Sequence, residues 1–471
     1  MSKFPDENAA FFRIHPADNV EVSVESGHKR ATCLIAEGER VIKYGSPIGI
    51  ATRDIAAGEW VHSHNLASAL RGLGEYGYEP VSAPLPGEGG ERSFLGYERE
   101  DGSAGIRNEV WIINTVGCVN KTAQRLADKT GAFAFPHPFG CSQLGDDLEY
   151  TQRILKGLVC HPNAAGVLVL GLGCENNNLE RFCRFLGEDI SPDRIRFLNA
   201  QDAEDEMAEG ETLIGELFSY AAGFHRTKQP LKKLKVGLKC GGSDGFSGIT
   251  ANPLVGRFSD LLIREGGSTV LTEVPEMFGA EHLFMERCRS REIFDKTVAL
   301  IRSFREYYLR HGQRIDENPS PGNREGGITT LEEKSLGCIQ KGGLSAVMDV
   351  LEPGEKIRGS GLHLLSGPGN DGVAVTNLAA SGAQMILFTT GRGTPLGAPV
   401  PTVKISTNTA LAQKKPHWID FDGGELLSEG NMEEMSERLM NLVLEIAEGK
   451  EALNEKNGYR EIAIFKNGVT L

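Results

Sequence analysis

Apolar and polar positions alternate in two ways along this chain, and the pattern changes near residue 101. Over residues 11–66, short β-type stretches are separated by turn residues, which is typical of a small all-β module. Residues 67–100 contain Pro80, Pro84 and Pro86 and no sustained period, so we expect a linker there.

Beyond residue 101, continuous apolar runs alternate with amphipathic stretches. The expected strands are Val110–Val116, Phe133–Pro136, Ala165–Leu172 and Arg194–Asn199. The expected helices are Lys121–Lys129, Asp146–Val159, Asn178–Leu186 and a long one that ends near Phe224. Buried strands that alternate with helices indicate a parallel sheet covered on both faces.

A second series of the same kind begins at Leu234–Leu238. Its further expected strands are Thr269–Glu273, Ala346–Leu351, His363–Ser366, Met385–Thr389, Pro401–Ser406 and Trp418–Asp420, with helices at Pro253–Glu265 and within Glu281–His311. Residues 316–343 are polar, Gly-rich and aperiodic, which predicts a long and therefore functional loop. The fold class we expect is α/β: a β module (11–66), a linker (67–100) and two α/β domains with parallel sheets (101–230 and 231–471).

Composition narrows the class of function. The chain has 471 residues, with 50 Lys+Arg against 64 Asp+Glu, and a formal net charge of -14. Without a basic stripe, this charge argues against nucleic acid as a partner. There is no apolar run of the ~18 residues that a membrane span needs. The polar start, residues 1–10, does not resemble a secretory signal, so we expect a cytoplasmic protein and leave a homo-oligomer open.

Cysteine position is more informative than cysteine number. The nine cysteines are an odd number, which favours reduced thiols over a disulfide framework. Four of them each close an apolar stretch and open a Gly-rich one: Cys118, Cys141, Cys174 and Cys240. We expect four further cysteines to be buried and to have only a packing role: Cys33, Cys160, Cys183 and Cys288.

Loops at the carboxyl ends of parallel strands converge, so these four thiols can lie near one another. A metal centre or a reactive thiol cluster is one interpretation. The other is that small residues are needed where strands turn sharply into helices. For Cys141 and Cys174, which stand beside Ser142, Glu175 and Asn176, we favour the functional interpretation. The spacing is not C-x-x-C, which excludes a zinc ribbon.

The β module ends with a pair of histidines, His62 and His64. On a strand, residues two apart project to the same face, where two imidazoles can share a metal or act as a base. His15, near Asp18, adds a third imidazole. Solvated edge histidines are an equally good interpretation.

The polar segment 318–335 is rich in hydrogen-bond donors. Its Asn323, Thr329, Thr330 and Lys334 could hold a polyhydroxylated anion, the alternative being a disordered surface loop. Arg392 follows a strand and can pair with a carboxylate. For three further acidic residues a solvated cluster is favoured over acid–base groups: Glu273, Glu276 and Glu281. Phosphate-loop, dinucleotide and nucleophile-elbow motifs are missing from the sequence.

Several motifs together resemble the altronate/galactarate dehydratase family. They are His15-x-x-Asp18-Asn19, Gly45-x-Pro47-Ile48-Gly49, His62-x-His64-Asn65, Gly140–Asp147, Gly171–Asn177, Cys240–Pro253 and Asn318–Cys338. The resemblance runs from about Ile14 to Leu471. It implies an SAF-type β-clip module followed by a large α/β catalytic region. Between Val24 and Ala31 the chain is shorter than is usual in the family, as if a hairpin were trimmed.

The resemblance implies removal of water from a sugar acid, first of all D-altronate to 2-keto-3-deoxy-D-gluconate in hexuronate catabolism, with Fe²⁺ or Mn²⁺. On this hypothesis His62, His64 and Lys334 are catalytic. Substrate would be held by Asn65, Asn323, Thr329, Thr330 and Arg392. The metal would be held by His15, His64, Cys141, Cys174 and Glu175.

Three alternatives stay open at this point. The same site could act on galactarate. It could also act on a sulfonated hydroxy acid, which is the substrate of related two-subunit enzymes. Three of the four strand-end thiols could instead hold an iron–sulfur cluster. The weakest alternative is a non-enzymatic carbohydrate-binding protein built on the β module.

Overall fold

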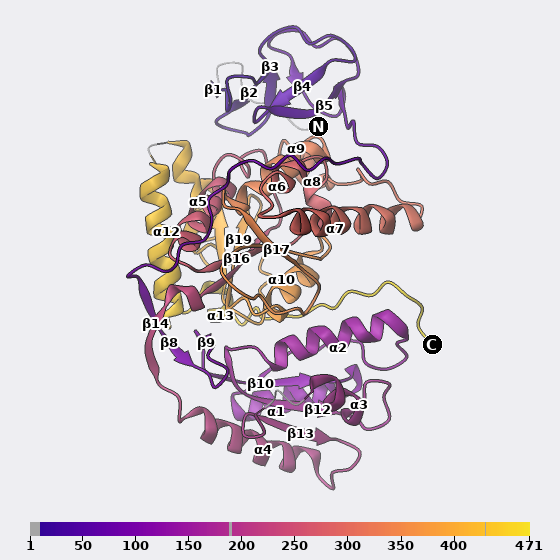
Figure 1. Cartoon of the computed structure of the whole chain (residues 1–471), viewed down its shortest axis with the longest axis vertical. Coiled ribbons are helices and arrows are strands. Elements are labelled where there is room, and N and C mark those ends of the chain that lie inside the picture. Colours follow the sequence, from indigo (N-terminus) through magenta and orange to yellow (C-terminus); the bar gives the residue numbers. More distant parts are fainter. Residues whose placement is uncertain (1–9, 188–190, 429) are drawn as a thin grey trace.

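The protein consists of three stacked parts (Figure 1), seen in a computed structural model that describes residues 10–187, 191–428 and 430–471. The β module lies at one end, the larger α/β domain in the middle and the smaller one at the other end. Most of the polar start discussed above, residues 1–9, lies outside the described residues. No helix in the described ranges is long and apolar enough to cross a membrane.

The β module is built from two small antiparallel sheets. One has the order β1-β2-β3-β6, with bounds Phe11–Phe12, Val20–Ser23, Lys29–Ala31 and Trp60–Val61. The other has the order β4-β5-β7, with bounds Arg40–Lys43, Ser46–Ala51 and Leu66–Ala67. Alternate apolar residues such as Val20, Val41 and Ile48 are buried between them, as the period of two predicts.

The segment between the module and the α/β domains ends in a strand. β8 (Ser93–Glu98) pairs with β14 (Arg226–Pro230) and with β9 (Ala104–Gly105) in a three-stranded antiparallel sheet. This small sheet therefore joins the start of the second domain to its end.

The second domain contains a four-stranded parallel sheet of order β11-β10-β12-β13. The strands are Phe133–Ala134, Glu109–Asn114, Ala164–Gly171 and Ile195–Asn199. Helices α1 (Asn120–Thr130) and α4 (Glu206–Ala221) cover one face. Helices α2 (Gly145–Val159) and α3 (Leu179–Leu186) cover the other face. Sequence periodicity predicted each of these elements.

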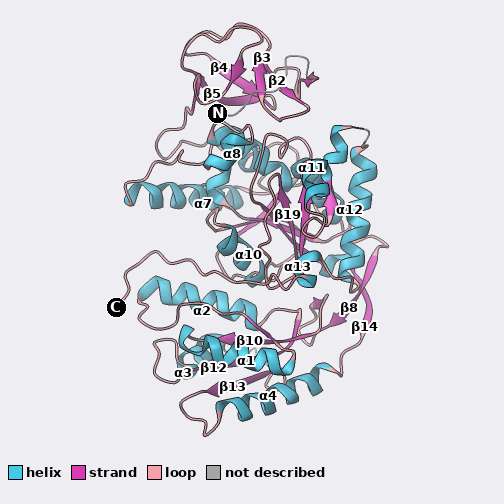
Figure 2. Cartoon of the chain, turned by 180° about the vertical axis from the view of Figure 1, so that it is seen from behind, coloured by secondary structure: helices cyan, strands magenta, loops and turns pink. Residues whose placement is uncertain are grey.

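The C-terminal domain contains a seven-stranded parallel sheet of order β17-β18-β16-β15-β19-β20-β21. Figure 2 shows the strands of this domain surrounded by its helices. The strands are Val347–Leu351, Gly361–Leu365, Ser268–Leu271, Lys235–Cys240, Met385–Thr390, Thr402–Ser406 and Phe421–Asp422. Its helices include α5 (Ala251–Arg264), α6 (His282–Met285), α7 (Arg291–Arg310), α10 (Asp371–Ala380), α11 (Thr409–Lys414), α12 (Met432–Ala447) and α13 (Leu453–Lys456). The expected α/β fold with a β-rich N-terminal module is confirmed.

Helix α2 lies between the two α/β domains and forms a core with both. Leu155 and Val159 belong to the same buried cluster as Leu378 of α10. The helices approach so closely that a Cβ on Gly157 would lie 2.2 Å from the carbonyl oxygen of Ala380. Only glycine permits this contact, so the two domains share one apolar interior.

Two local expectations were wrong. Residues 316–343 are not a loop, because they contain α8 (Pro321–Glu325) and α9 (Leu331–Cys338). Every residue of α9 is buried, and its polar side chains pair with other segments, so it shows no amphipathic period. The last strand lies at Phe421–Asp422 rather than at Trp418–Asp420. It follows a turn in which Trp418 N donates to Lys415 O.

Candidate metal and sugar-acid site

A polar pocket of about 460 Å³ lies at the carboxyl edge of the seven-stranded sheet. This edge is where parallel sheets bind ligands. The lining residues come from the ends of β15, β16 and β19, from α8 and α9, and from the start of α10. They are Cys240, Gly241, Gly242, Glu276, Asn318, Ser320, Gly322, Asn323, Lys334, Gly369, Asp371 and Arg392.

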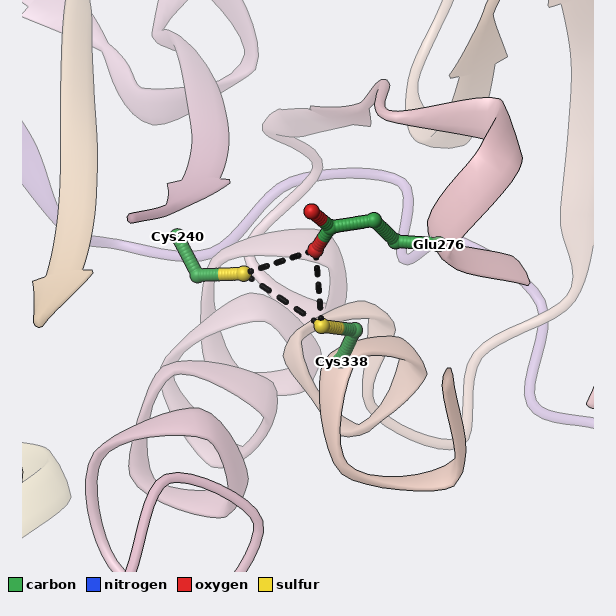
Figure 3. A group of neighbouring side chains, drawn as sticks. All are labelled: Cys240, Glu276 and Cys338. Atoms are coloured by element: carbon green, nitrogen blue, oxygen red, sulfur yellow. Dashed lines mark hydrogen bonds between the residues drawn. The ribbon is translucent and has the colours of Figure 1, made fainter. Parts of the chain in front are cut away.

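Cys240 and Glu276, which line this pocket, converge with the buried Cys338 (Figure 3), and we call these three side chains the pocket floor. The two sulfur atoms are 3.3 Å apart. Glu276 Oε2 lies 3.4 Å from Cys240 Sγ and 3.1 Å from Cys338 Sγ. Among the described residues this is the group of His, Cys, Asp or Glu side chains whose ligand atoms lie close enough to hold a metal ion.

Local backbone geometry brings these side chains together. Cys240 is the last residue of β15, and its N–H donates to the carboxylate of Glu273. Glu273 has a left-handed conformation, φ 69°, between β16 and the short helix that carries Glu276. A non-glycine residue in this region stores strain, which is common at functional sites. The turn at Glu273 aims Glu276 at the thiols.

The two thiols have opposite acidities. The hydrogen bond from Cys338 lowers the pKa of Cys240 to about 6, and the nearby charge of Lys341 acts in the same direction. The same hydrogen bond raises the pKa of Cys338 well above its ordinary value. Near neutral pH, Cys240 is therefore the thiolate and Cys338 the donor.

Buried ammonium groups balance the negative charge. Burial alone would raise the pKa of Glu276, but Lys334, whose Nζ is 2.8 Å from Oε1, outweighs it and the pKa falls to about 2. Lys239 forms ion pairs with Glu273 and with Asp371, the latter at 2.7 Å. Lys341 Nζ is buried without a hydrogen-bond partner in the described structure, 3.5 Å from Glu273. Such an ammonium group stabilises anionic sulfur nearby.

The chemistry of the donor set fits a divalent transition metal. Two sulfur atoms and one carboxylate oxygen lie on one side of the position that a metal would occupy, and the pocket lies on the other side. Soft thiolate ligands select metals such as Fe²⁺ or Zn²⁺ over Mg²⁺ or Ca²⁺. Three protein ligands with free positions are typical of catalytic rather than structural sites.

Three of the residues predicted from sequence line this pocket: Lys334, Asn323 and Arg392. Lys334 Nζ donates to Asn323 Oδ1 at 3.1 Å in addition to its pair with Glu276. Asn323 also donates to Ser243 O, which fixes its amide. Arg392 donates to Gly322 O and lies 3.2 Å from Glu325 at the rim.

Three other predicted substrate-binding residues have structural partners outside the pocket lining. Thr329 accepts a hydrogen bond from Lys29 Nζ at 2.7 Å. Thr330 caps α9 and donates to Ile48 O in the β module. Asn65 is buried and closes a turn, because its Oδ1 accepts from His62 N and its amide donates to Trp60 O.

The paired histidines do not lie on a strand. β6 ends at Val61, and His62 and His64 belong to the turn that Asn65 closes. His62 Nε2 lies 3.0 Å from Arg324 O in α8, so this imidazole contacts a helix that lines the pocket. His64 and His15 are exposed. None of the three is among the lining residues.

The predicted metal ligands of the second domain form a separate edge. Cys141 and Cys174 are exposed. Glu175 is buried and accepts hydrogen bonds from Thr115 and from the N–H groups of Leu172 and Gly173, so it closes its own loop. Among the described residues, the expected set of His15, His64, Cys141, Cys174 and Glu175 does not meet at one point. Four strand-end thiols do not gather either, because Cys118 is also exposed whereas Cys240 is buried in the other domain.

Sequence reasoning missed Cys338 and undervalued Glu276. Cys338 belongs to the segment predicted as a loop, and the sequence pattern assigns it no role. Glu273, Glu276 and Glu281 are buried rather than solvated, so that expectation was wrong. Cys33, expected to be buried, is exposed. The usable signal was the position of Glu276 just after a strand whose neighbour ends at Cys240.

Comparisons with known families cover most of the chain. The model described as D-galactarate/altronate dehydratase, C-terminal, matches residues 231–470. The second domain of D-galactarate dehydratase/altronate hydrolase matches residues 96–222, and the altronate/galactarate dehydratase SAF domain matches residues 21–69.

Curated relatives match over nearly their full length. Altronate dehydratase of Escherichia coli strain K12 is 49% identical, over 98% of this chain and 100% of the relative. Altronate dehydratase of Bacillus subtilis strain 168 is 52% identical, over 96% of this chain and 93% of the relative. Galactarate dehydratase (L-threo-forming) of Escherichia coli strain K12 is 30% identical, over 97% of both chains.

Proposed function

The chain belongs to the D-galactarate/altronate dehydratase family, and on that basis we propose that it converts D-altronate to 2-keto-3-deoxy-D-gluconate. It is a hydro-lyase that acts on a sugar acid. The observation that carries the proposal is the buried Cys240–Glu276–Cys338 group on the floor of a polar pocket, together with near-complete similarity to two altronate dehydratases. Galactarate is the second candidate, since a galactarate dehydratase is 30% identical.

The pocket residues supply what the elimination needs. Loss of water from a 2,3-dihydroxy acid requires removal of a weakly acidic proton beside a carboxylate. A divalent metal at Cys240, Glu276 and Cys338 would supply Lewis-acid stabilisation of the developing charge, worth several kcal/mol. Lys334 is held by Glu276, Asn318 and Asn323 with its ammonium group at the pocket wall, where its positive charge can stabilise a substrate carboxylate.

The charge of the site suits a substrate with one carboxylate. Four cations surround the floor: Lys239, Lys334, Lys341 and Arg392. They face three carboxylates and two thiols: Glu273, Glu276, Asp371, Cys240 and Cys338. If the buried Lys239–Glu273 ion pair is counted as neutral, with both thiols ionised and a divalent metal bound, one positive charge is left over. Glu325 already neutralises part of the positive charge of Arg392 at the rim of the pocket. A second substrate carboxylate would therefore find no unpaired cation there.

We propose Fe²⁺ as the metal, with Mn²⁺ as the alternative. Two thiolates favour iron, whereas Mn²⁺ prefers carboxylate and carbonyl oxygens. Only two cysteines take part in the group, so the described residues offer little for an iron–sulfur cluster, which usually needs three or four thiolates.

Roles for other predicted residues stay proposals. Lys334 is proposed as catalytic, with Asn323 and Arg392 as substrate-binding residues, because all three line the pocket. His62 contacts α8 from the β module, so its proposed catalytic role requires that the substrate reach the rim. For His64 the proposal rests on the sequence motif alone.

A substrate panel tests the proposed function. The metal-stripped enzyme would be given D-altronate, galactarate and a sulfonated hydroxy acid, each with Fe²⁺, with Mn²⁺ or without metal. We expect 2-keto acid to form from D-altronate, fastest with Fe²⁺. Turnover of galactarate or of the sulfonated acid alone would contradict the proposal.

We also propose that the enzyme works with reduced thiols in the cytoplasm. All nine cysteines are free, and a thiolate metal site needs reduced sulfur. A homo-oligomer stays a prediction that size-exclusion chromatography with light scattering can check.

A further inference from the structure

The proposed elimination needs a proton acceptor, and most groups in the pocket cannot serve. Cys240 and Glu276 would be occupied by the metal. Lys334 is an ammonium group whose hydrogens are directed at Glu276, Asn318 and Asn323, and the charge of Glu276 raises its pKa. Arg392 stays protonated. Among the described lining residues, Asp371 is the one carboxylate that remains.

Asp371 is placed for this task by three neighbours. It is the first residue of α10, and Asn370 caps that helix. Lys239 Nζ donates to Asp371 Oδ1 at 2.7 Å and so fixes the carboxylate. Oδ2 faces Gly241, where an added Cβ would lie 2.7 Å away. A side chain at residue 241 would therefore fill the space in front of the carboxylate.

The second oxygen of Asp371 is available to a ligand. Oδ2 accepts no hydrogen bond from the described residues, and the Asp371 side chain is 37% exposed whereas that of Lys239 is 0% exposed. The carboxylate is thus held on one side by Lys239 and is open on the other, toward the pocket that Cys240 and Glu276 also line. A general base needs this combination of fixed orientation and access.

We infer that Asp371 is the base that removes the C2 proton of the sugar acid, with Lys239 as its positioning residue. This inference rests on the proposed function. The C2–H bond breaks, the proton passes to Asp371 Oδ2, and the electron pair forms the C2–C3 double bond. The C3–O bond breaks toward oxygen. Asp371 returns the proton to the departing hydroxyl, which leaves as water. The C2 enol then becomes the ketone, because it loses its hydroxyl proton and gains a proton at C3.

The test compares Asp371→Asn and Asp371→Ala with the wild type, all loaded with Fe²⁺. We expect kcat on D-altronate to fall by about 10²–10⁴-fold with KM and bound metal nearly unchanged, since base catalysis contributes this much. Small carboxylates such as formate should restore part of the activity of Asp371→Ala. Asp349→Asn, which alters a surface ion pair with Lys296, is the matched control and should keep full activity.

Each outcome decides the matter. A primary isotope effect with C2-deuterated substrate that grows in Asp371→Glu, together with formate rescue, supports the base role. Full turnover by Asp371→Asn overturns it. Loss of activity without formate rescue, with loss of metal or a lowered melting temperature, assigns Asp371 a structural role and also overturns it. If the wild type converts no sugar acid of the panel, the proposed function fails first, and the inference with it.

Discussion

Single residues at the pocket floor carry the clearest chemical consequences. Cys240 and Cys338 are 3.3 Å apart, yet one thiol is acidified and the other is not. The asymmetry arises because a shared hydrogen bond leaves one sulfur as acceptor and the other as donor. Nearby lysines then favour the anion on the acceptor.

Replacing Cys338 with Ala should remove the metal without unfolding the protein. The variant loses one of three ligands, so we expect metal affinity to fall by at least about 10–100-fold, the effect typical of weaker outer-shell changes. Metal content after dialysis measures this, with circular dichroism as the check on folding. Cys288→Ala is a matched buried control and should retain metal. Equal metal content in the Cys338 and Cys288 variants would contradict the assignment.

The metal-free enzyme should contain a thiolate at neutral pH. Because the hydrogen bond from Cys338 lowers the pKa of Cys240 to about 6, the thiolate exists above that pH and is lost below it. Ultraviolet thiolate absorbance followed against pH should therefore rise with a midpoint of about 6, well below the ~8.5 of an ordinary thiol. Cys240→Ala should abolish this rise, and its persistence in that variant would assign the thiolate elsewhere.

Among the elements, α9 connects the β module to the pocket. Glu333 on α9 accepts from Lys29 at 2.7 Å and from Lys43 at 2.8 Å, and all three side chains are no more than 1% exposed. The next residue on the helix is Lys334 and the last is Cys338. The β module therefore holds the helix that carries two residues of the site.

Glu333→Gln should destabilise the protein and change its response to acid. Removing one partner of a buried ion pair costs about 3–5 kcal/mol. Burial would raise the pKa of Glu333, but Lys29 and Lys43 outweigh it and lower the pKa to about 2. Because the folded pKa lies below the ordinary 4.5, this stabilisation is present above pH 4.5 and is lost as the pH falls toward 2.

Chemical denaturation at several pH values measures this effect. The wild type should lose free energy of unfolding between pH 4.5 and the lowest accessible pH, and the variant should lose less. Glu306→Gln, at an exposed position of α7, is the control. Parallel pH profiles for wild type and Glu333→Gln would contradict a stabilising contribution of the ion pairs that Glu333 forms with Lys29 and Lys43.

How much the sequence predicts depends on what buries each element. Strands such as β12 are apolar throughout, since both faces of the sheet are covered, and their pattern alone identified them. Helix α9 escaped prediction because Glu332, Glu333 and Lys334 are buried against distant partners. Its burial depends on ion pairs with distant segments, and the local hydrophobic periodicity does not indicate such pairs.

The residues of the candidate site also divide into those that a local sequence pattern identifies and those that depend on tertiary packing. Cys240 could be found because it ends a strand, Arg392 because it follows a strand, and Lys334 because it stands in a long polar segment. Cys338 and Glu276 could not be assigned, since their meeting with Cys240 depends on how three separate segments pack. The thiols of the second domain carry the same local pattern as Cys240 but lie at the edge of another sheet.

At the scale of the whole molecule, the C-terminal segment joins the two α/β domains. Phe465 packs against Tyr150 of α2 and Tyr307 of α7. The N–H groups of Asn467 and Gly468 donate to Asp147 at 2.7 and 2.8 Å. The segment therefore crosses from the C-terminal domain to the second domain.

Truncation of residues 462–471 should lower the melting temperature and leave the metal site intact. Ile464 is 5% exposed, and its burial is worth about 1.5–3 kcal/mol. Each kcal/mol corresponds to about 2–4 °C in chains of 150–250 residues and to less in longer ones, so a shift of a few degrees is expected by differential scanning fluorimetry. Val469→Ser, at a position 73% exposed, should change nothing. An unchanged melting temperature after truncation would show that the segment contributes no stability.

The contact at Gly157 has a consequence for how the molecule loses its structure. Since α2 and α10 contribute to one apolar interior, neither α/β domain can open without exposing the core of the other. The pair should melt as a single cooperative unit, with one calorimetric transition for both. A chain divided at residue 230 would leave each half with an uncovered apolar face, and the halves should aggregate unless they are produced together.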